Sequence, residues 1–281
     1  MNPSGSPSPH DPCVRIIRRG PVLQAELNRP DTRNPLGPET VSALDAAVHE
    51  ADTDEAVRVL LITAAGDSFS AGGNLGNLQE RLQAPAASDG RDAIAVSNRL
   101  YGAFLMHLAA SPKVSIVAVQ GAAMGGGAGL ACAADLSIGT VSARFGFPEA
   151  AIGLVPGQIL PFVAARIGIP AARRLMLTGE RIDGTEAHRI GLLDYLAQDA
   201  AALATRTQSL LTSVLACGPT ASRNTKRLLR FVANYSDRTA LAAYLDEAAN
   251  VFATQMRTEA IEGVTASRAK RKPQWAVAVP E

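Results

Sequence analysis

Two glycine-rich turns carry the residue types from which a catalytic site could be built. The first is Gly125-Gly126-Gly127, which follows an apolar, β-branched run at 114–119 and precedes an Ala-rich segment at 128–134. The run predicts a buried strand, and the Ala-rich segment predicts a helix that begins at the glycines. The first N–H groups of a helix have no partner within it, so they can bind a negatively charged oxygen. This turn therefore supplies half of a candidate oxyanion hole.

The second turn contains Gly72 and Gly73 and follows another predicted strand, at 57–63. Glycine permits backbone conformations that other residues avoid, and ligands often bind where a central strand ends. Each of the two turns can present one backbone amide, and two amides that converge on one oxygen form an oxyanion hole. A tight connection without chemistry remains the alternative for each turn.

A nucleotide-binding loop fits the first turn less well than an oxyanion hole does. A phosphate-binding P-loop requires Gly-Lys-Ser/Thr after its glycines, whereas Ala128 and Gly129 follow here. A dinucleotide fingerprint requires an acidic residue at the end of the next strand. Glu149 has about the right separation, but it lies in the sequence Phe-Gly-Phe-Pro-Glu. We therefore favour the oxyanion interpretation.

Length and composition narrow the class of protein. The chain has 281 residues, of which 47% are hydrophobic, so it can bury a full core. Its net charge of +1 gives no electrostatic footprint for nucleic acid. Cys13, Cys132 and Cys217 are odd in number and widely separated, which suits reduced thiols. With no signal peptide and no apolar stretch of membrane-spanning length, we expect a cytoplasmic protein that binds neither nucleic acid nor membrane.

The pattern of apolar residues predicts alternating strands and helices, with a largely helical C-terminal third. Strands are expected at 14–18 and 22–27, joined by a turn, and a loop near the mouth of the site is expected at 76–92. We expect helices at 38–51, 93–110, 160–177, 184–190, 200–215, 220–233 and 238–254, followed by a basic tail at 267–275. The four histidines lie outside the glycine turns, and no set of residues has the spacing of a metal site or of a Ser-His-Asp triad.

Several motifs, in order along the chain, resemble those of the crotonase superfamily, the enoyl-CoA hydratase/isomerase family. They cover nearly everything from Val14 to Trp275 and comprise Leu-Asn-Arg-Pro at 27–30, Phe-Ser-Ala-Gly-Gly-Asn-Leu at 69–75, the glycine segment 121–130, Phe-Gly-Phe-Pro-Glu at 145–149 with Gly-Leu-Val-Pro at 153–156, and Lys-Arg-Lys-Pro at 270–273. Within the family, the segments 127–130, 156–162 and 270–275 look most like those of isohexenylglutaconyl-CoA hydratases.

The resemblance implies an α/β fold, the crotonase (ClpP-like) spiral of ββα units. It implies a disordered tail at 1–12, a core with the acyl-CoA site at 13–200, and a helical trimerisation region at 201–281. A homotrimer or a hexamer is expected. No separate cofactor and no metal are expected, because CoA is part of the acyl-CoA thioester substrate.

The resemblance also assigns roles to individual residues. The backbone amides of Ala71 and Gly126 would hold the thioester oxygen, which becomes negatively charged as an enolate forms. The remaining substrate contacts are expected from Arg29, Asp31, Thr32, Gly73, Asn74, Leu75, Gly125, Gly129, Gln158 and Lys270. Lys270 would pair with the CoA phosphates, although its basic run also fits a solvated tail.

Of the acid/base residues that the resemblance implies, only Glu149 is present in this sequence. Typical hydratases carry two glutamates, and Gly129 stands at the position of the first. Partial burial of Glu149 among apolar neighbours would raise its pKa. Gln158 is a candidate to position a water molecule, or simply a polar group at a helix start. Gly129 would leave room for a substrate carboxylate.

These assignments predict an enzyme that adds water to an α,β-unsaturated acyl-CoA, of branched or glutaconyl type. A double-bond isomerase that uses Glu149 alone is the second interpretation. The third is an acyl-CoA-binding protein without catalytic activity, because one acid/base residue is missing.

Overall fold

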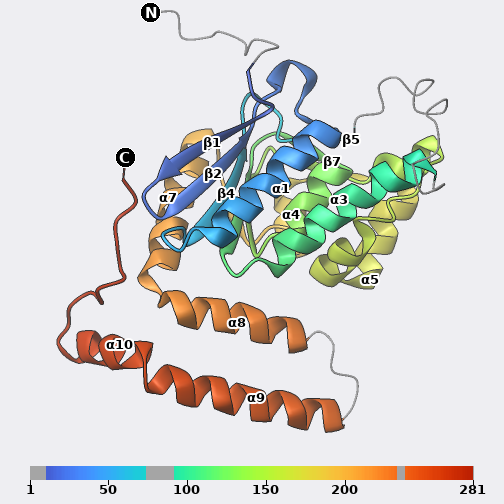
Figure 1. Cartoon of the computed structure of the whole chain (residues 1–281). Helices are drawn as coiled ribbons and strands as arrows, with labels where there is room; N and C mark the ends of the chain where they lie inside the picture. Colours follow the sequence, from blue (N-terminus) through green and yellow to red (C-terminus); the bar gives the residue numbers. More distant parts are fainter. Residues whose placement is uncertain (1–10, 74–91, 233–237, 281) are drawn as a thin grey trace, which may run out of the picture.

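A six-stranded sheet forms the centre of the protein (Figure 1). The computed structural model describes residues 11–73, 92–232 and 238–280. The strands lie in the order β1-β2-β4-β6-β8-β11, and every neighbouring pair is parallel except β1 and β2. They are β1 (Val14–Arg19), β2 (Val22–Leu27), β4 (Val59–Ala64), β6 (Val114–Val119), β8 (Leu136–Thr140) and β11 (Tyr195–Ala197).

Both faces of this sheet are buried, as is usual for a parallel sheet. Along β4, Leu60 and Ile62 belong to one hydrophobic core and Val59 and Leu61 to a second, because successive side chains of a strand point to opposite faces. The first core is closed by α1 (Pro38–Thr53), α3 (Ala93–Ala110) and α4 (Gly126–Ala133), and the second by α7 (Ala200–Ala216).

The chain repeats one pattern three times: a strand of the main sheet, a short strand outside it, and a helix. The repeats are β4-β5-α3, β6-β7-α4 and β8-β9-α5, and they form the spiral of ββα units that the sequence predicts. The short strands are β3 (Pro35–Leu36), which pairs with β5 (Gly72–Gly73), and β7 (Ala122–Met124), which pairs with β9 (Arg144–Gly146), itself paired with β10 (Arg181–Asp183). These short strands carry both glycine turns.

The remaining core elements are helical. They are the 3-10 helices η1 (Pro30–Thr32) and η2 (Pro148–Ile152), and the helices α5 (Leu160–Thr178) and α6 (Gly184–Arg189). Helix α5 is kinked at Gly168, whose φ of 73° is not helical and which lies two residues before Pro170. Among the described residues, no helix is both long and apolar enough to cross a membrane.

Three helices form an arm that extends below the core in Figure 1. They are α8 (Pro219–Val232), α9 (Arg238–Met256) and α10 (Glu259–Arg268). The arm is tied to the core by Lys226, whose Nζ lies 2.6 Å from an Asp135 carboxylate oxygen. The predicted boundary at residue 200 lies too early, because α7 packs on the main sheet and belongs to the core.

The end of the described chain returns from the arm to the main sheet. Val279 is 8% exposed and belongs to the second core, together with Val22. Pro280 lies beside Gly20, at the turn between β1 and β2, where a β-carbon on the glycine would be 3.1 Å from the proline ring. The guanidinium of Arg58 donates to the carbonyl of Trp275 at 2.6 Å. The last residues are therefore part of the core.

The predicted helices at 38–51, 93–110, 160–177, 184–190, 200–215, 220–233 and 238–254 are confirmed, with small shifts at their ends. The strands at 14–18, 22–27, 57–63 and 114–119 are confirmed as well. Helix α10 and the short strands β3 and β5 to β11, apart from β6, were not predicted. The predicted loop at 76–92 lies almost wholly outside the described residues, as does the N-terminal tail up to residue 10.

Candidate active site

The two glycine turns lie side by side and are joined by backbone hydrogen bonds. The Ser70 N–H donates to the Ala122 carbonyl and the Met124 N–H to the Ser70 carbonyl, each at 2.9 Å. The fit is close, since a β-carbon at Gly72 would lie 2.5 Å from the Met124 carbonyl oxygen and 3.4 Å from the Gly126 nitrogen. With φ at +86°, Gly72 also holds a conformation that favours glycine. Two separate strand ends therefore form one continuous site.

Asn34 connects this site to the loop after β2. Its side-chain amide donates to the carbonyls of Ala65 and Ser68 at 3.0 and 2.9 Å, and its side-chain oxygen accepts from the Arg29 N–H at 2.7 Å. The residue is 1% exposed and has φ at +51°, a conformation that asparagine tolerates better than most residues. Sequence analysis missed Asn34, although an Asn before Pro is a recognisable turn signal.

The amide of Ala71, predicted to be one donor of the oxyanion hole, is already engaged. It donates to the Arg33 carbonyl at 2.7 Å, so it is not free to bind a ligand oxygen. Arg33 reaches this position because its backbone is left-handed, with φ at +60°. The prediction for Ala71 is therefore wrong in this structure, and the other amides of the same turn are the remaining candidates.

The amide of Gly73 is the candidate among them. In the parallel pair of β3 and β5, Pro35 lies opposite Gly72 and Leu36 opposite Gly73. Pro35 has no N–H, so in this register the Leu36 N–H is the donor from β3, and its acceptor is the Gly72 carbonyl. The Gly73 N–H therefore points away from β3. Helix α4 packs on β5. A β-carbon at Gly73 would meet no atom within 4 Å, so the space around this residue is open.

Gly126 is placed as predicted, as the first residue of α4. The amide of its neighbour Gly125 is engaged, since it donates to the Gly146 carbonyl at 2.8 Å. The Gly126 N–H is the first of the helix and has no acceptor within it. The helix dipole adds to the attraction that this amide exerts on a negatively charged oxygen.

Glu149 approaches the same turn from η2. Its Oε1 would lie 2.6 Å from a β-carbon at Gly125, so the carboxylate rests on the glycine backbone. Its Oε2 is buried and has no hydrogen-bond partner among the described residues. Burial raises the pKa of the Glu149 carboxyl, and a hydrogen bond with its own backbone only partly opposes this. The structure therefore brings a carboxylate suited to proton transfer next to the Gly126 amide.

Position 129 does not offer the predicted open space. Gly129 is buried in α4, and a β-carbon there would lie 2.4 Å from Cγ2 and 2.7 Å from Cβ of Ile159. The isoleucine therefore fills the space beside the missing glutamate. The expectation that Gly129 leaves room for a substrate carboxylate is wrong.

Gln158 lies over Gly102 of α3. A β-carbon at Gly102 would come within 1.9 Å of the Gln158 Oε1, so only glycine leaves this space to the carboxamide. Gln158 is half-buried, and its side chain has no hydrogen bond with the described residues. Its amide therefore keeps its capacity to bind a water molecule.

A cavity of 440 Å³ opens between η1, the start of α1 and β5. Arg29, Thr32 and Gly73, three of the residues predicted to bind CoA, line it together with Pro38 and Thr40. Asp31 is exposed on η1 and is not part of the lining. Asn74 and Leu75 lie outside the described residues. Lys270 follows α10, on the arm below the core, so a single chain does not bring it to this cavity (Figure 1).

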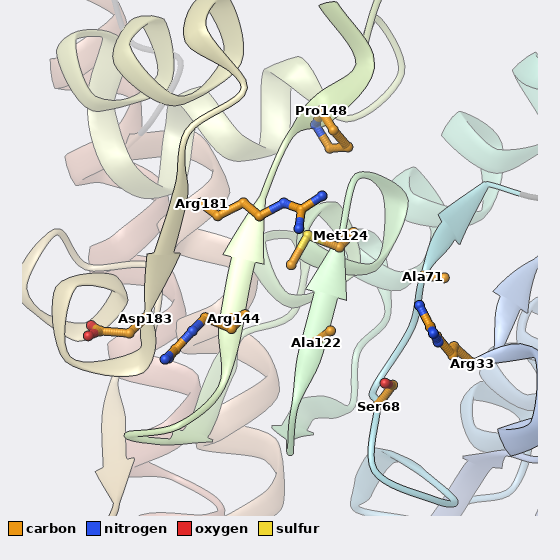
Figure 2. A pocket seen from close by; sticks show the side chains of 9 residues that line it. All are labelled: Arg33, Ser68, Ala71, Ala122, Met124, Arg144, Pro148, Arg181 and Asp183. Atoms are coloured by element: carbon orange, nitrogen blue, oxygen red, sulfur yellow. The ribbon is translucent and has the colours of Figure 1, made fainter. Parts of the chain in front are cut away.

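A larger cavity of 670 Å³ lies on the other side of the glycine turns (Figure 2). Ala71, Met124 and Pro148 form its wall nearest the site, and each of them is within two residues of Gly73, Gly126 or Glu149. Three arginines, Arg33, Arg144 and Arg181, surround the rest, from two separate sides of the cavity. None of them forms an ion pair with a described carboxylate.

Tyr101 is a residue of the site that sequence analysis missed. It lies on α3 and donates its hydroxyl hydrogen to the Gly126 carbonyl at 2.5 Å. Burial raises the pKa of the phenol, and the nearby Cys132 and Glu149 raise it further. Nothing in the sequence distinguishes this tyrosine from an ordinary residue of an amphipathic helix. No group of three His, Cys, Asp or Glu side chains in the described part of the chain could hold a metal ion.

Comparison with known proteins identifies the family of the chain. Residues 18–277 match the family model of enoyl-CoA hydratase/isomerase. The chain is 32% identical to a crotonyl-CoA hydratase of Syntrophomonas wolfei, over 89% of this chain and 92% of the other. It is 31% identical to the 1,2-epoxyphenylacetyl-CoA isomerase of Escherichia coli, over 90% and 94%.

A solved enoyl-CoA hydratase/isomerase of Marinobacter aquaeolei has the same fold. It superposes with a TM-score of 0.88 at 37% identity, over 94% of this chain and 99% of the other. The family match and the solved relative agree with the ββα spiral. The chain therefore belongs to the enoyl-CoA hydratase/isomerase family and has the crotonase fold.

Proposed function

We propose that this protein hydrates an α,β-unsaturated acyl-CoA with Glu149 as its acid/base residue. The observation that carries the proposal is the position of the carboxylate. It rests on Gly125, it has a buried oxygen without a partner, and it lies beside the unengaged amide of Gly126. A buried carboxylate with a raised pKa is suited to accept and return a proton near neutral pH.

In this proposal, the amides of Gly73 and Gly126 bind the thioester oxygen. Addition of water to the β-carbon moves the π electrons of the conjugated system onto that oxygen, which becomes an enolate. Fixed N–H donors stabilise this charge, and such stabilisation is usually the largest catalytic contribution. The two turns are held together by backbone hydrogen bonds, so the donors are positioned before the substrate binds.

One carboxylate is sufficient for a balanced reaction. Glu149 takes a proton from water as the oxygen bonds to the β-carbon, and it returns that proton to the α-carbon as the enolate collapses. The net change is the addition of one water molecule. Gln158 is the candidate to hold the water, because a carboxamide can both donate and accept hydrogen bonds.

The CoA part would lie along the cavity lined by Arg29, Thr32 and Gly73. A contribution from Lys270 would require a second copy of the chain, in keeping with a trimer or a hexamer. A branched or glutaconyl-type acyl group is supported by the similarity of the motifs at 127–130, 156–162 and 270–275 alone. The packing of Ile159 on Gly129 removes the structural argument for it.

Double-bond isomerisation is the second candidate, and the filled space at Gly129 favours it. With one carboxylate, Glu149 would remove a proton from one carbon of the acyl chain and return it to another, without water. The E. coli relative is named as an isomerase of 1,2-epoxyphenylacetyl-CoA, and the S. wolfei relative as a hydratase of crotonyl-CoA. Both reactions pass through the same stabilised oxyanion.

Incubation with three substrates distinguishes the candidates. Crotonyl-CoA, a β,γ-enoyl-CoA and a branched glutaconyl-type CoA are each mixed with the protein, and the products are analysed by mass and by absorbance. A gain of one water supports the hydratase, and a shifted double bond at constant mass supports the isomerase. If neither occurs while acyl-CoA binds, the catalytic proposal is wrong and the binding interpretation stands.

A further inference from the structure

The Gly126 amide belongs to a turn with unusual conformational freedom. Three glycines follow one another, and Gly125 has φ and ψ of 50° and −116°, a conformation outside the helical region. Glycine loses more backbone freedom on ordering than any other residue. An oxyanion hole requires the opposite property, because its donors must point at one place in space. Something outside the turn must therefore fix Gly126.

Tyr101 makes two contacts that do so. Its hydroxyl donates to the Gly126 carbonyl, and its ring lies against the α-carbon, where a β-carbon would be 3.4 Å from Cε1 and 3.5 Å from Cζ. Leu36 approaches the same position to 3.3 Å from β3. The tyrosine is itself held in α3, and its ring centroid lies 6.0 Å from that of Phe104, which is fully buried. Helix α3 thus adds the contacts of one residue to the backbone hydrogen bonds that hold this turn.

The phenol is a constant donor in this setting. Burial raises its pKa, and the negative charge of Glu149 acts in the same direction. The hydroxyl therefore stays protonated over the pH range in which an acyl-CoA thioester is handled. The Gly125 carbonyl accepts the first helical hydrogen bond of α4, from the Gly129 N–H at 2.9 Å. The Gly126 carbonyl lies one residue further along, in the first turn of the helix, and the phenol donates to this oxygen.

We propose that Tyr101 is a positioning residue for the oxyanion hole, acting through Gly126. The inference rests on the proposed function, because it assumes that the Gly126 amide binds the thioester oxygen. Tyr101 does not itself need to touch the substrate. It fixes the orientation of the residue whose N–H does.

Tyr101→Phe tests the inference, because it keeps the ring and removes only the hydroxyl. We expect kcat to fall about five- to tenfold, the effect of one net hydrogen bond, while KM changes less than twofold. Acetoacetyl-CoA provides a direct readout. Its enolate absorbs differently from its keto form, so the pH at which the bound ligand enolises measures oxyanion stabilisation. In the variant this pH should rise by about one unit.

Tyr195→Phe is the matched control. Tyr195 lies on β11 at the edge of the main sheet, beside Arg206, and removal of its hydroxyl should leave the enolisation pH unchanged. A purely structural role of Tyr101 would lower the unfolding temperature of Tyr101→Phe without moving the enolisation pH, and that result would overturn the inference. If the wild-type protein shows neither turnover nor enolate, the proposed function fails and this inference fails with it.

Discussion

The carboxylate of Glu149 rests on the α-carbon of Gly125, so closely that a β-carbon on the glycine would lie 2.6 Å from Oε1. The contact exists because residue 125 has no side chain, and its φ of +50° also favours glycine there. The acid/base group and the first amides of α4 therefore share one small space. The predictions below follow from how that space is built.

Glu149→Gln should abolish turnover while acyl-CoA still binds. The amide is nearly isosteric with the carboxyl group but cannot exchange a proton usefully, and the Gly73 and Gly126 amides are unchanged. A turnover assay measures the loss of catalysis, and titration calorimetry measures the retained binding of acyl-CoA. Full activity of the variant would move the proton transfer to another residue.

Glu149 should also make stability depend on pH. Because burial raises its pKa in the folded protein above that in the unfolded chain, ionisation costs free energy only in the folded state. The free energy of unfolding should therefore fall as pH rises from the ordinary glutamate pKa through the raised one. Glu149→Gln should lose this part of the pH dependence, as measured by thermal unfolding at a series of pH values. Identical profiles for both proteins would contradict it.

Gly73→Pro should lower kcat by about two to three orders of magnitude, because proline removes one of the two amide donors. Gly73→Ala keeps the amide, and a β-carbon there meets no atom within 4 Å, so this control should retain near-normal activity. Ala71→Pro is the second comparison, since it removes only a bond to the Arg33 carbonyl. A folded Gly73→Pro variant with normal turnover would show that residue 73 is not an oxyanion donor.

Gly129→Ala should destabilise the protein by about 1–3 kcal/mol, because its methyl group overlaps Ile159. In an Ile159→Gly background the same change should cost little, whereas Ile159→Ala should give only partial relief, since the overlap with Cβ remains at 2.7 Å. Chemical denaturation of the single and double variants measures this coupling. Additive effects would mean that the isoleucine does not close position 129.

The arm should mediate self-association. Phe252 is 68% and Leu245 is 56% exposed on α9 in the single chain, which leaves apolar surface uncovered. Phe252→Glu together with Leu245→Glu should shift a trimer or hexamer towards monomer in light scattering. Asn250→Glu, on the same helix, is the control for added charge. A wild-type protein that is monomeric at working concentration would contradict the prediction.

The sequence predicted the fold well where a pattern is local. The apolar runs at 57–63 and 114–119 became β4 and β6, and the periodic segment at 93–110 became α3 with the same ends. Helix α10 was not predicted, because its own sequence has a weak apolar pattern. Helix α10 is stabilised by residues that follow it in the chain. Arg271 pairs with Glu262, and the Trp275 ring lies 3.2 Å from where a β-carbon of Gly263 would be.

The sequence indicated individual turns and residues of the candidate site, but not the hydrogen bonds and packing contacts between them. A glycine turn shows that a backbone amide can be presented, but not which amide is already engaged. The Ala71 amide is engaged by Arg33, which lies 38 positions earlier and reaches it through a left-handed backbone. In the same way, the sequence shows that position 129 lacks a glutamate. Only packing shows that Ile159 takes the space.

Val279 and Pro280 connect the two ends of the chain. Val279 seals the second core beside Val22, and Pro280 covers the turn at Gly20. Removal of the last few residues would therefore expose the second core at Val22 and the turn between β1 and β2. Newly exposed apolar surface can associate with other molecules. A C-terminal truncation intended to dissociate an oligomer would thus create an aggregation-prone apolar surface, so point substitutions in α9 are the better way to obtain a monomer.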